Sequence, residues 1–251
     1  GVVPSCNAPR SELLSYSRPR RDLREPDEMK HSPTSLSRRS FLKGAAQVHQ
    51  SFWAEGFWAS YNENPYTYDP TKAKALLAEA GYPDGFSLDL DAPNFAPFVN
   101  MAQSVQATFA EGGVKVNIVS SEMAPMLTKY RAREHQALMV YWGPDYMDPH
   151  TNADGFVTNL DNTDAATKGK PLAWRNSWLD EELVKATAAA AQEADEAKRE
   201  AAYIQLQKDV LDRGAFAIMF QSISQRADRS NIKGYVQGSS ADVTYYNLTT
   251  K

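Results

Sequence analysis

Residues 86–142 read FSLDLDAPNFAPFVNMAQSVQATFAEGGVKVNIVSSEMAPMLTKYRAREHQALMVYW, and this stretch decides the fold. Apolar and polar residues alternate at 86–90 and again at 114–118, which predicts a strand in each place. Between the two strands, apolar residues recur at helical spacing from 98 to 109 and are followed by two glycines. The first half of the stretch therefore predicts a strand, a helix and a second strand.

The second half of the stretch continues this order. Residues 121–134 predict another helix, and the apolar run at 137–142 is typical of a buried parallel strand. The alternation of strands and helices indicates an α/β fold with an open, mostly parallel sheet flanked by helices. Ligands bind such sheets beyond the carboxyl ends of the strands, so the loop Gly143–Pro149 is the expected site.

A helix with clear end signals precedes the sheet segment. Asp69 is placed to cap it, Pro70 occupies its first position and Gly81 ends it. Four apolar residues at helical spacing form its predicted stripe: Ala73, Leu76, Leu77 and Ala80.

More elements are predicted after the sheet segment. A polar loop spans 151–175, and a capping box of Ser177 and Asp180 then begins a helix over 178–192. A second helix over 194–213 carries one apolar face. Three strands follow, a buried one at 216–220 and two more at 231–238 and 243–248.

Composition argues against several classes of protein. The chain has 251 residues, a net charge of −4 and a pI of about 5.6, whereas a general nucleic-acid binder is normally basic. Cys6 is the only cysteine, so neither a disulfide framework nor a cysteine-based zinc site is expected. No run of 18 apolar residues exists, so no membrane-spanning helix is expected.

The sequence carries no motif for catalysis or cofactor binding. It has no G-x-S-x-G nucleophile motif, no G-x-G-x-x-G and no Walker A loop. His135, His150, Asp145 and Asp148 are residue types that bind metals, but no H-x-x-x-H or H-E-x-x-H spacing supports them. We therefore expect a protein that is not an enzyme and needs neither a cofactor nor a metal held by its own residues.

Residues 1–46 differ in composition from the rest of the chain. They carry nine Lys and Arg against five Asp and Glu, with five prolines and only two aromatic residues. Such a segment buries too little apolar surface to offset its ordering entropy, so a disordered tail is predicted. The remaining body, 47–251, is predicted to divide into an α/β lobe at 69–215 and strands at 216–251.

Within this tail, residues 37–43 read SRRSFLK and resemble the twin-arginine export signal S-R-R-x-F-L-K. An export signal also needs an apolar segment of about 7–15 residues. Residues 44–50 read GAAQVHQ and turn polar at once. We therefore expect the motif to direct export poorly in this chain.

Residues 68–82 read YDPTKAKALLAEAGY and resemble the "YDPxKAKxLLxEAGY" segment of the family 5 extracellular solute-binding proteins. These proteins are the receptors of peptide, nickel and opine ABC importers. WGPDYMDP at 142–149 is similar to the family's "WGADYxDP" loop, and IKGY at 232–235 fits its last strands. The resemblance covers roughly residues 44–251.

The resemblance implies the C-terminal lobe of a periplasmic-binding-protein-like (type II) fold. It also implies a monomeric, periplasmic receptor that captures a small peptide or peptide-like solute and delivers it to ABC permease subunits. Complete members carry a first lobe ahead of the YDP segment, so the chain is expected to be truncated. Its last strands are then expected to return towards that missing lobe.

The loop at 142–149 holds the first candidate site residue. In peptide-binding members, the residue that matches Asp145 pairs with the ligand's α-ammonium group, and a carboxylate in a closed cleft is a strong partner for a cation. The alternative is that Asp145 is only an Asx-turn residue. Asp148 and Pro149 are interpreted as structural residues, a turn and cap.

Aromatic and basic residues supply the other candidates. Tyr141 and Trp142 end a predicted strand, so one is expected to face the cleft while the other packs under a helix. By resemblance, Trp174 and Arg175 line the cleft, with Arg175 meeting a ligand carboxylate; the alternative is a surface loop anchored by Trp174. Weaker candidates after the first strand are Asn94 and Phe95.

Two other readings of the family resemblance stay open. The chain is either a receptor for nickel or a metal chelate, or a fragment that binds nothing because its cleft has a single wall.

Overall fold

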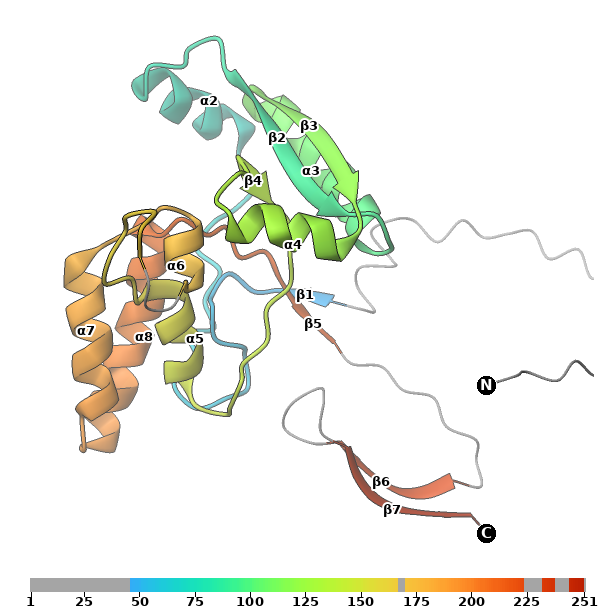
Figure 1. Ribbon diagram of the computed structural model, residues 1–251, viewed down its shortest axis with the longest axis vertical. Coiled ribbons are helices and arrows are strands. Elements are labelled where there is room, and N and C mark those ends of the chain that lie inside the picture. The colour runs from blue at the N-terminus through green and yellow to red at the C-terminus, as the bar shows by residue number, and fades with distance from the viewer. Residues whose placement is uncertain (1–45, 167–169, 224–231, 238–243, 251) are drawn as a thin grey trace, which may run out of the picture. The chain divides into compact units, whose positions relative to one another are not determined.

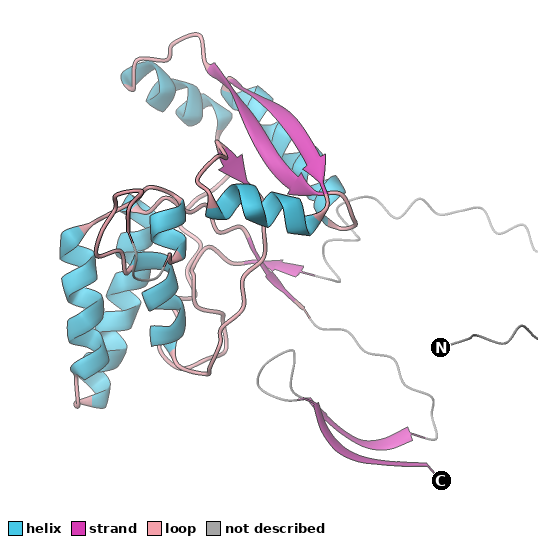
Figure 2. Cartoon of the chain, viewed as in Figure 1, coloured by secondary structure: helices cyan, strands magenta, loops and turns pink. Residues whose placement is uncertain are grey.

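The computed structural model describes residues 46–166, 170–223, 232–237 and 244–250 (Figure 1). Residues 1–45 of the predicted disordered tail 1–46, which include the twin-arginine motif, therefore lie outside the described residues. Seven helices are described in this part: α2 (Pro70–Glu79), α3 (Phe98–Gly112), α4 (Met123–Arg131), α5 (Pro149–Val157), α6 (Leu172–Arg175), α7 (Glu181–Gln192) and α8 (Glu196–Arg213). Its strands are β1 (Ala46–Val48), β2 (Phe86–Pro93), β3 (Val114–Ser121), β4 (Ala137–Leu138), β5 (Phe220–Ser222), β6 (Ile232–Gln237) and β7 (Thr244–Thr250) (Figure 2).

Three strands form the predicted parallel sheet, in the order β3-β2-β4. Phe86 opposes Val114 in one ladder, and Leu90 opposes Ala137 in the other. The α/β class and the order of these elements are confirmed. The third strand is much shorter than the predicted 137–142, because its ladder with β2 stops near Pro93, which has no backbone N–H to contribute.

Strand alternation places a helix on each face of the sheet. Leu90 and Ala92 of β2 are buried in one apolar cluster with Ala102 of α3. Asp91, between them, points to the other face, where Lys129 Nζ of α4 donates to both of its carboxylate oxygens at 2.9 and 2.7 Å. The helices α3 and α4 therefore cover opposite faces, as Figure 1 shows.

The end signals of α2 are confirmed. The Asp69 side chain accepts from the backbone N–H of Lys72 at 2.9 Å, and Pro70 is the first helical residue. Gly81 follows the helix with a φ of 90°, a conformation that suits glycine, and Tyr82 N–H donates to the Leu77 carbonyl. The predicted apolar stripe packs only loosely, since no residue of α2 is buried.

The predicted polar loop at 151–175 is wrong, because it contains the helices α5 and α6. Asp148 caps α5 by accepting from His150 N–H at 2.9 Å, and Pro149 stands at its first position. From the sequence, Asp148 and Pro149 predict only a turn and cap. A short helix with a glycine and few strong helix formers has little propensity of its own, so burial of its apolar face stabilises it.

The helices α5, α7 and α8 pack around a second apolar core. The predicted face of α8 is confirmed, with Tyr203, Leu206 and Val210 buried in this core. The start of α7 differs from the prediction: Asp180 is the N-cap, and the helix begins at Glu181 rather than at residue 178. The side chain of Asp180 accepts from two backbone N–H groups, which explains why it caps in place of Ser177.

A fully buried glutamine holds the segment before α2 against α8. Gln207 has no exposed surface, and its amide nitrogen donates to the carbonyl oxygens of Ala59 at 2.7 Å and Tyr203 at 2.9 Å. Its oxygen accepts from Tyr61 N–H at 3.0 Å and from the Ser51 hydroxyl. Every polar group of this side chain is therefore used inside the fold.

The C-terminal strands form two antiparallel pairs. Val48 of β1 opposes Phe220 of β5, and Ala46, the last residue of the predicted disordered tail, opposes Ser222, so the prediction is wrong at that residue. The predicted strand at 216–220 is wrong over its first four residues; Phe216 instead packs against the Phe156 ring at 4.7 Å between ring centres. The two later predicted strands are confirmed as the pair β6–β7.

Candidate functional site

Aromatic side chains gather where β2 and the loop after β4 leave the sheet. Phe95 lies edge-on to Phe98 at 5.3 Å between ring centres, and Phe98 lies 6.0 Å from Tyr141. Tyr141 is 68% exposed, and Phe95 and Asn94 are also exposed. The structure thus brings Phe95 and Tyr141 together through Phe98, and it fixes Asn94 beside them by a backbone bond to Ser121.

Trp142 leans in a different direction from Tyr141. Its ring meets Phe156 of α5 edge-on at 6.4 Å, close to Gly155, and it is 44% exposed. The predicted strand ends at Leu138, so the alternation of faces expected for Tyr141 and Trp142 is absent. Trp142 does pack against a helix, but both residues keep exposed surface. Two aromatic surfaces therefore flank the start of the loop Gly143–Pro149.

Asp145 lies in this loop with its carboxylate open. Its backbone N–H donates to Thr151 Oγ1 at 3.2 Å, which ties the loop to the first turn of α5. The side chain is exposed, and it has no hydrogen-bond or ion-pair partner among the described residues. An Asx turn would use the carboxylate to accept a local backbone N–H, as Asp161 does from Thr163 at 2.9 Å. Asp145 shows no such bond in the described part of the chain.

Asp148, three residues later, is fully engaged. Besides capping α5, its two carboxylate oxygens each accept from Arg199 Nη2 at 2.8 Å. This confirms the interpretation of Asp148 and Pro149 as a turn and cap. Burial raises the pKa of Tyr146 between these two aspartates, and the negative charges of Asp148, Asp154 and Asp145 raise it further. The loop is therefore electronegative, and Asp145 is its carboxylate without a partner in the described residues.

Trp174 and Arg175 have structural partners instead. Trp174 is 3% exposed and its indole N–H donates to the Thr163 carbonyl at 2.9 Å. Arg175 Nε donates to the Lys170 carbonyl at 2.9 Å, and burial lowers the pKa of its guanidinium. Neither Thr163 nor Lys170 belongs to the loop Gly143–Pro149. Trp174 thus anchors its own loop, which favours the alternative weighed for it from the sequence.

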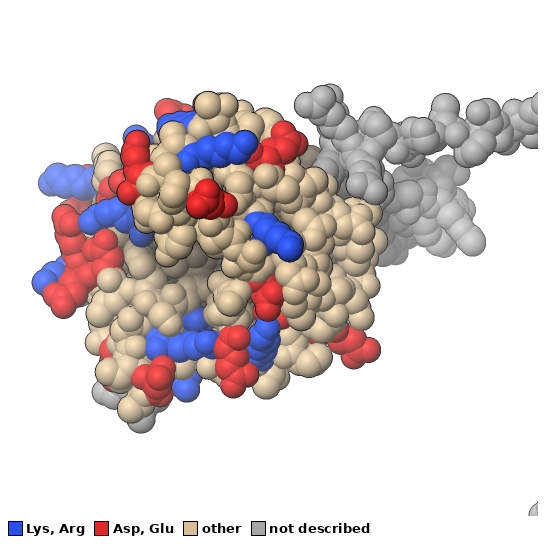
Figure 3. Space-filling view, turned by 90° about the horizontal axis from the view of Figure 1, so that it is seen from above, with Lys and Arg blue, Asp and Glu red and all other residues tan. Residues whose placement is uncertain are grey.

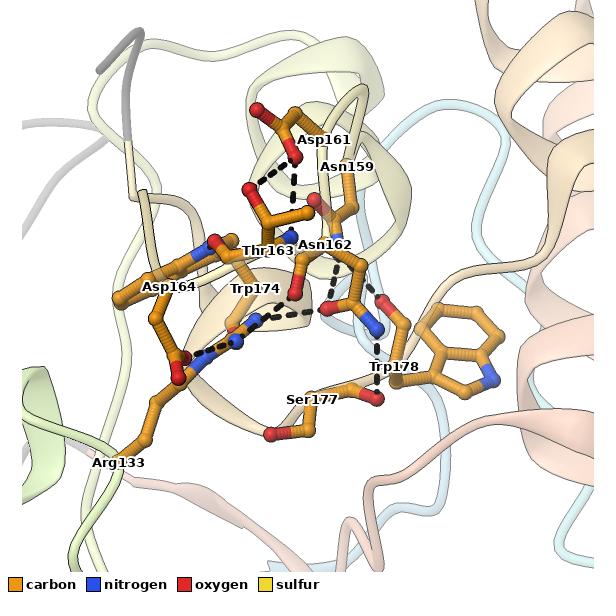
Figure 4. Close-up of polar contacts among 9 residues, drawn as sticks. All are labelled: Arg133, Asn159, Asp161, Asn162, Thr163, Asp164, Trp174, Ser177 and Trp178. Carbon is orange, nitrogen blue, oxygen red and sulfur yellow. Dashed lines mark hydrogen bonds and ion pairs between the residues drawn. The ribbon is translucent and has the colours of Figure 1, made fainter. Parts of the chain in front are cut away.

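Arg133 organises this region, and no sequence motif predicts that role. Its guanidinium donates to the Trp174 carbonyl at 2.6 Å, to the Asn162 carbonyl at 2.9 Å and to Asp164 Oδ1 at 3.0 Å (Figure 4). Asn162 also accepts from Arg133 through its side chain at 2.6 Å and donates to the Ser177 carbonyl at 3.1 Å. Figure 4 shows these bonds converging on one guanidinium. No spacing motif marks such partners.

Membrane-spanning helices and metal-binding clusters can both be searched for in the described residues. In the described ranges, no helix is long and apolar enough to cross a membrane, and no three His, Cys, Asp or Glu side chains are grouped to hold a metal ion. On the face shown in Figure 3, Lys and Arg alternate with Asp and Glu and form no continuous basic patch.

Comparison with known proteins gives consistent matches. Residues 37–164 match the family model described as bacterial extracellular solute-binding proteins, family 5 middle. The chain is 33% identical over 205 residues to a dipeptide-binding protein of Escherichia coli strain K12, covering 79% of this chain and 37% of that protein. It is 31% identical over 198 residues to heme-binding protein A of Haemophilus influenzae, covering 76% and 35%.

Solved structures show the same fold. The periplasmic binding protein DppA of Helicobacter pylori, in complex with the peptide STSA, superposes with a TM-score of 0.64 at 24% identity, over 78% of this chain and 38% of that one. This likeness shows the fold alone, and it confirms the predicted type II periplasmic-binding-protein class. The chain spans little more than a third of the length of the curated relatives it matches. Its family model covers just over half of its residues, and the chain belongs to the bacterial extracellular solute-binding proteins of family 5.

Proposed function

We propose that the protein is the substrate-binding component of an ABC importer and captures a small peptide or peptide-like solute in the periplasm. Membership of the family supports this role, as does the name of the E. coli relative, a dipeptide-binding protein. The proposed partners are the ABC permease subunits that receive the ligand, and the proposed functional unit is a monomer.

The open carboxylate of Asp145 carries the proposal. A peptide at neutral pH has an ammonium group at its amino end, and a carboxylate is the natural partner for such a cation. The backbone N–H of Asp145 is bonded to Thr151 Oγ1, which holds the residue in place. Its carboxylate makes no bond within the described residues and can therefore accept hydrogen bonds from a ligand. Asp148 is already paired with Arg199 and is not available for that role.

The exposed rings beside Asp145 supply the second part of the site. Tyr141, Trp142 and Phe95 offer apolar and aromatic surface, which recognises side chains without demanding one identity. Asn94, next to Phe95, adds an amide that can bond to a peptide backbone. An ammonium partner beside aromatic surface is the arrangement expected for a small peptide.

Exposure limits how strongly this chain holds such a ligand. An ion pair in contact with water contributes roughly 0–1 kcal/mol. Solute-binding proteins gain affinity when two lobes close on the ligand and exclude water. Tyr141 and Asp145 are exposed, so we expect this chain to bind a dipeptide with a dissociation constant in the millimolar range or weaker. A closed cleft can reach micromolar affinity, which corresponds to a binding free energy of about −8 kcal/mol.

NMR titration tests this function in the 251-residue chain. Dipeptides with apolar side chains are added up to millimolar concentrations, and signals of Tyr141 and Trp142 are followed. The proposal expects saturable shifts for free dipeptides and weaker ones for N-acetylated dipeptides. Nickel ions, a nickel chelate and heme serve as competing ligands. Saturable shifts with one of these, and none with any peptide, would favour a different ligand class, and no saturable shift with any ligand would show a chain that does not bind alone.

A further inference from the structure

We propose that Arg199 is a positioning residue for the ligand site: by binding Asp148 it fixes the loop Gly143–Asp148 and leaves Asp145 as the carboxylate open to the ligand. Its ligand-binding consequence rests on the proposed function. Its effect on the loop itself can be measured without any ligand.

The Arg199–Asp148 pair is built to be rigid. Arg199 Nη2 lies 2.8 Å from both carboxylate oxygens of Asp148. The two side chains are only 23% and 30% exposed. The guanidinium carbon also lies 5.1 Å from the ring centres of Trp58 and Tyr203, so two aromatic faces hold the cation in place. Such a partly buried, stacked pair is better defined than an ordinary surface ion pair.

The pair connects the loop to α8, an element distant in sequence. Asp148 already bonds to His150 N–H at the start of α5, and its own N–H donates to the Tyr146 carbonyl at 3.0 Å. At the other end of this turn, Asp145 N–H donates to Thr151 Oγ1. Both ends of the turn thus rest on the first turn of α5, and Arg199 adds the one ion-paired restraint on it among the described residues.

The pair also neutralises one of the two carboxylates of the loop, Asp148, and leaves the other, Asp145, unpaired within the described residues. Three carboxylates, those of Asp145, Asp148 and Asp154, act on Tyr146, and Arg199 is the cation that opposes them there. A guanidinium shared between Asp145 and Asp148 would neutralise the residue that the ligand needs. Because Trp58 and Tyr203 hold the guanidinium of Arg199 beside Asp148, the carboxylate of Asp145 keeps its charge for a ligand cation.

Amide hydrogen exchange of the free protein tests the restraint. Arg199→Met removes the charge and keeps an apolar stem against Trp58, and we expect the Asp145 amide to exchange about tenfold faster as the turn opens locally. Arg213→Met is the matched control on the same helix, because Arg213 pairs with Asp180 and Glu182 instead. Its Asp145 amide should exchange as in the unmodified chain.

If the amides of α8 lose their protection from exchange in Arg199→Met, that variant has failed to fold. A second variant then provides the test. Asp148→Asn removes the same ion pair, while asparagine still caps a helix. It should give the same faster exchange of the Asp145 amide. Unchanged exchange at Asp145 in a folded variant of either kind overturns the proposal.

Peptide binding then separates positioning from direct contact. The readout is the ratio of affinities for a free dipeptide over its N-acetylated form, expected to be up to about fivefold in the unmodified chain. Arg199→Met, Asp148→Asn and the double variant should all lower this ratio to about twofold or less, with no further loss in the double variant. Additive losses would mean that Arg199 touches the ligand, against a positioning role. If the unmodified chain binds no peptide, the chain does not bind alone, and the exchange result by itself decides the role of Arg199.

Discussion

The guanidinium carbon of Arg133 lies 3.8 Å from the centre of the Trp174 ring, while its Nε donates to the carbonyl oxygen of that same residue. Arg133 therefore grips both the side chain and the backbone of Trp174. The same guanidinium reaches Asn162 and Asp164, and its side chain is only 10% exposed. This single residue fixes the loop that follows α5 to the end of α4.

Replacing Arg133 by lysine should destabilise the protein. Lysine has one ammonium group in place of the fork, so several of the four bonds shown in Figure 4 are lost and buried carbonyl groups lose their donors. We expect the free energy of unfolding to fall by about 1.5–3 kcal/mol. Urea denaturation measures it, with Arg131→Lys on the exposed end of α4 as a control that should stay within about 0.5 kcal/mol. Equal midpoints for the two variants would show that the Arg133 fork adds no stability.

Gln207→Met should also destabilise the fold, by a different route. Methionine fills a similar volume but leaves the Ala59 carbonyl and the Tyr61 N–H without partners inside the protein. Unsatisfied buried groups cost about 1–3 kcal/mol each, so we expect a loss of at least about 2 kcal/mol. Gln205→Met, two residues earlier on the exposed side of α8, is the control and should change little. Similar thermal midpoints for the two variants would contradict the assigned role of Gln207.

The titration of Tyr146 reports the charge of the site loop. Its pKa is raised, first by burial and then by the three neighbouring aspartates, so its phenol should ionise above the ordinary value of about 10. A raised pKa contributes stability below the unfolded value, and this contribution is lost as the pH rises through the folded value. Ultraviolet absorbance of the unmodified chain minus Tyr146→Phe measures this pKa. Asp145→Asn should lower it, and Arg199→Met should raise it; shifts in the opposite directions would contradict the charge arrangement.

Limited proteolysis tests the division between tail and body. The basic, proline-rich composition of residues 1–46 predicts that trypsin cuts after Arg38 or Arg39. Pairing of Ala46–Val48 with β5 should stop the digestion there, so the resistant core is expected to begin at residue 39 or 40, or at residue 44 if trypsin also cuts after Lys43. Mass spectrometry of the core identifies its first residue. Survival of the Arg38–Arg39 pair, or a core that begins after Val48, would contradict this division.

The parts of the fold that sequence reasoning predicted are those with local signals. Alternating residues gave β2 and β3, and Asp69, Pro70 and Gly81 marked the bounds of α2. Helix α5 was missed because it is short and its residues have weak helix propensity. Tyr141 and Phe95 were predicted only as separate candidates, and the structure brings them together through Phe98 because the carboxyl ends of parallel strands share an edge.

The residues that sequence reasoning missed bind partners far along the chain. Arg199 meets Asp148 across 51 positions, and Gln207 meets Tyr61 across 146. Neither pairing leaves a periodic pattern in the sequence, because side chains find such partners only after the helices pack. Trp174 shows where sequence reasoning left two readings open: the partners Arg133 and Thr163, which favour the anchor over the ligand contact, also come from distant positions.

The central claim is that Asp145 binds the amino end of a peptide, and one set of NMR titrations tests it most directly. A dipeptide and its N-acetylated form are titrated into the unmodified chain, Asp145→Asn and the control Asp84→Asn. Asp84 is an exposed carboxylate just before β2 begins, whereas the site residues Asn94 and Phe95 follow the other end of that strand. We predict that the free dipeptide is preferred by up to about fivefold in the unmodified chain and in Asp84→Asn, and that the preference disappears in Asp145→Asn. A preference that survives in Asp145→Asn would contradict the assignment of Asp145 to the ligand site.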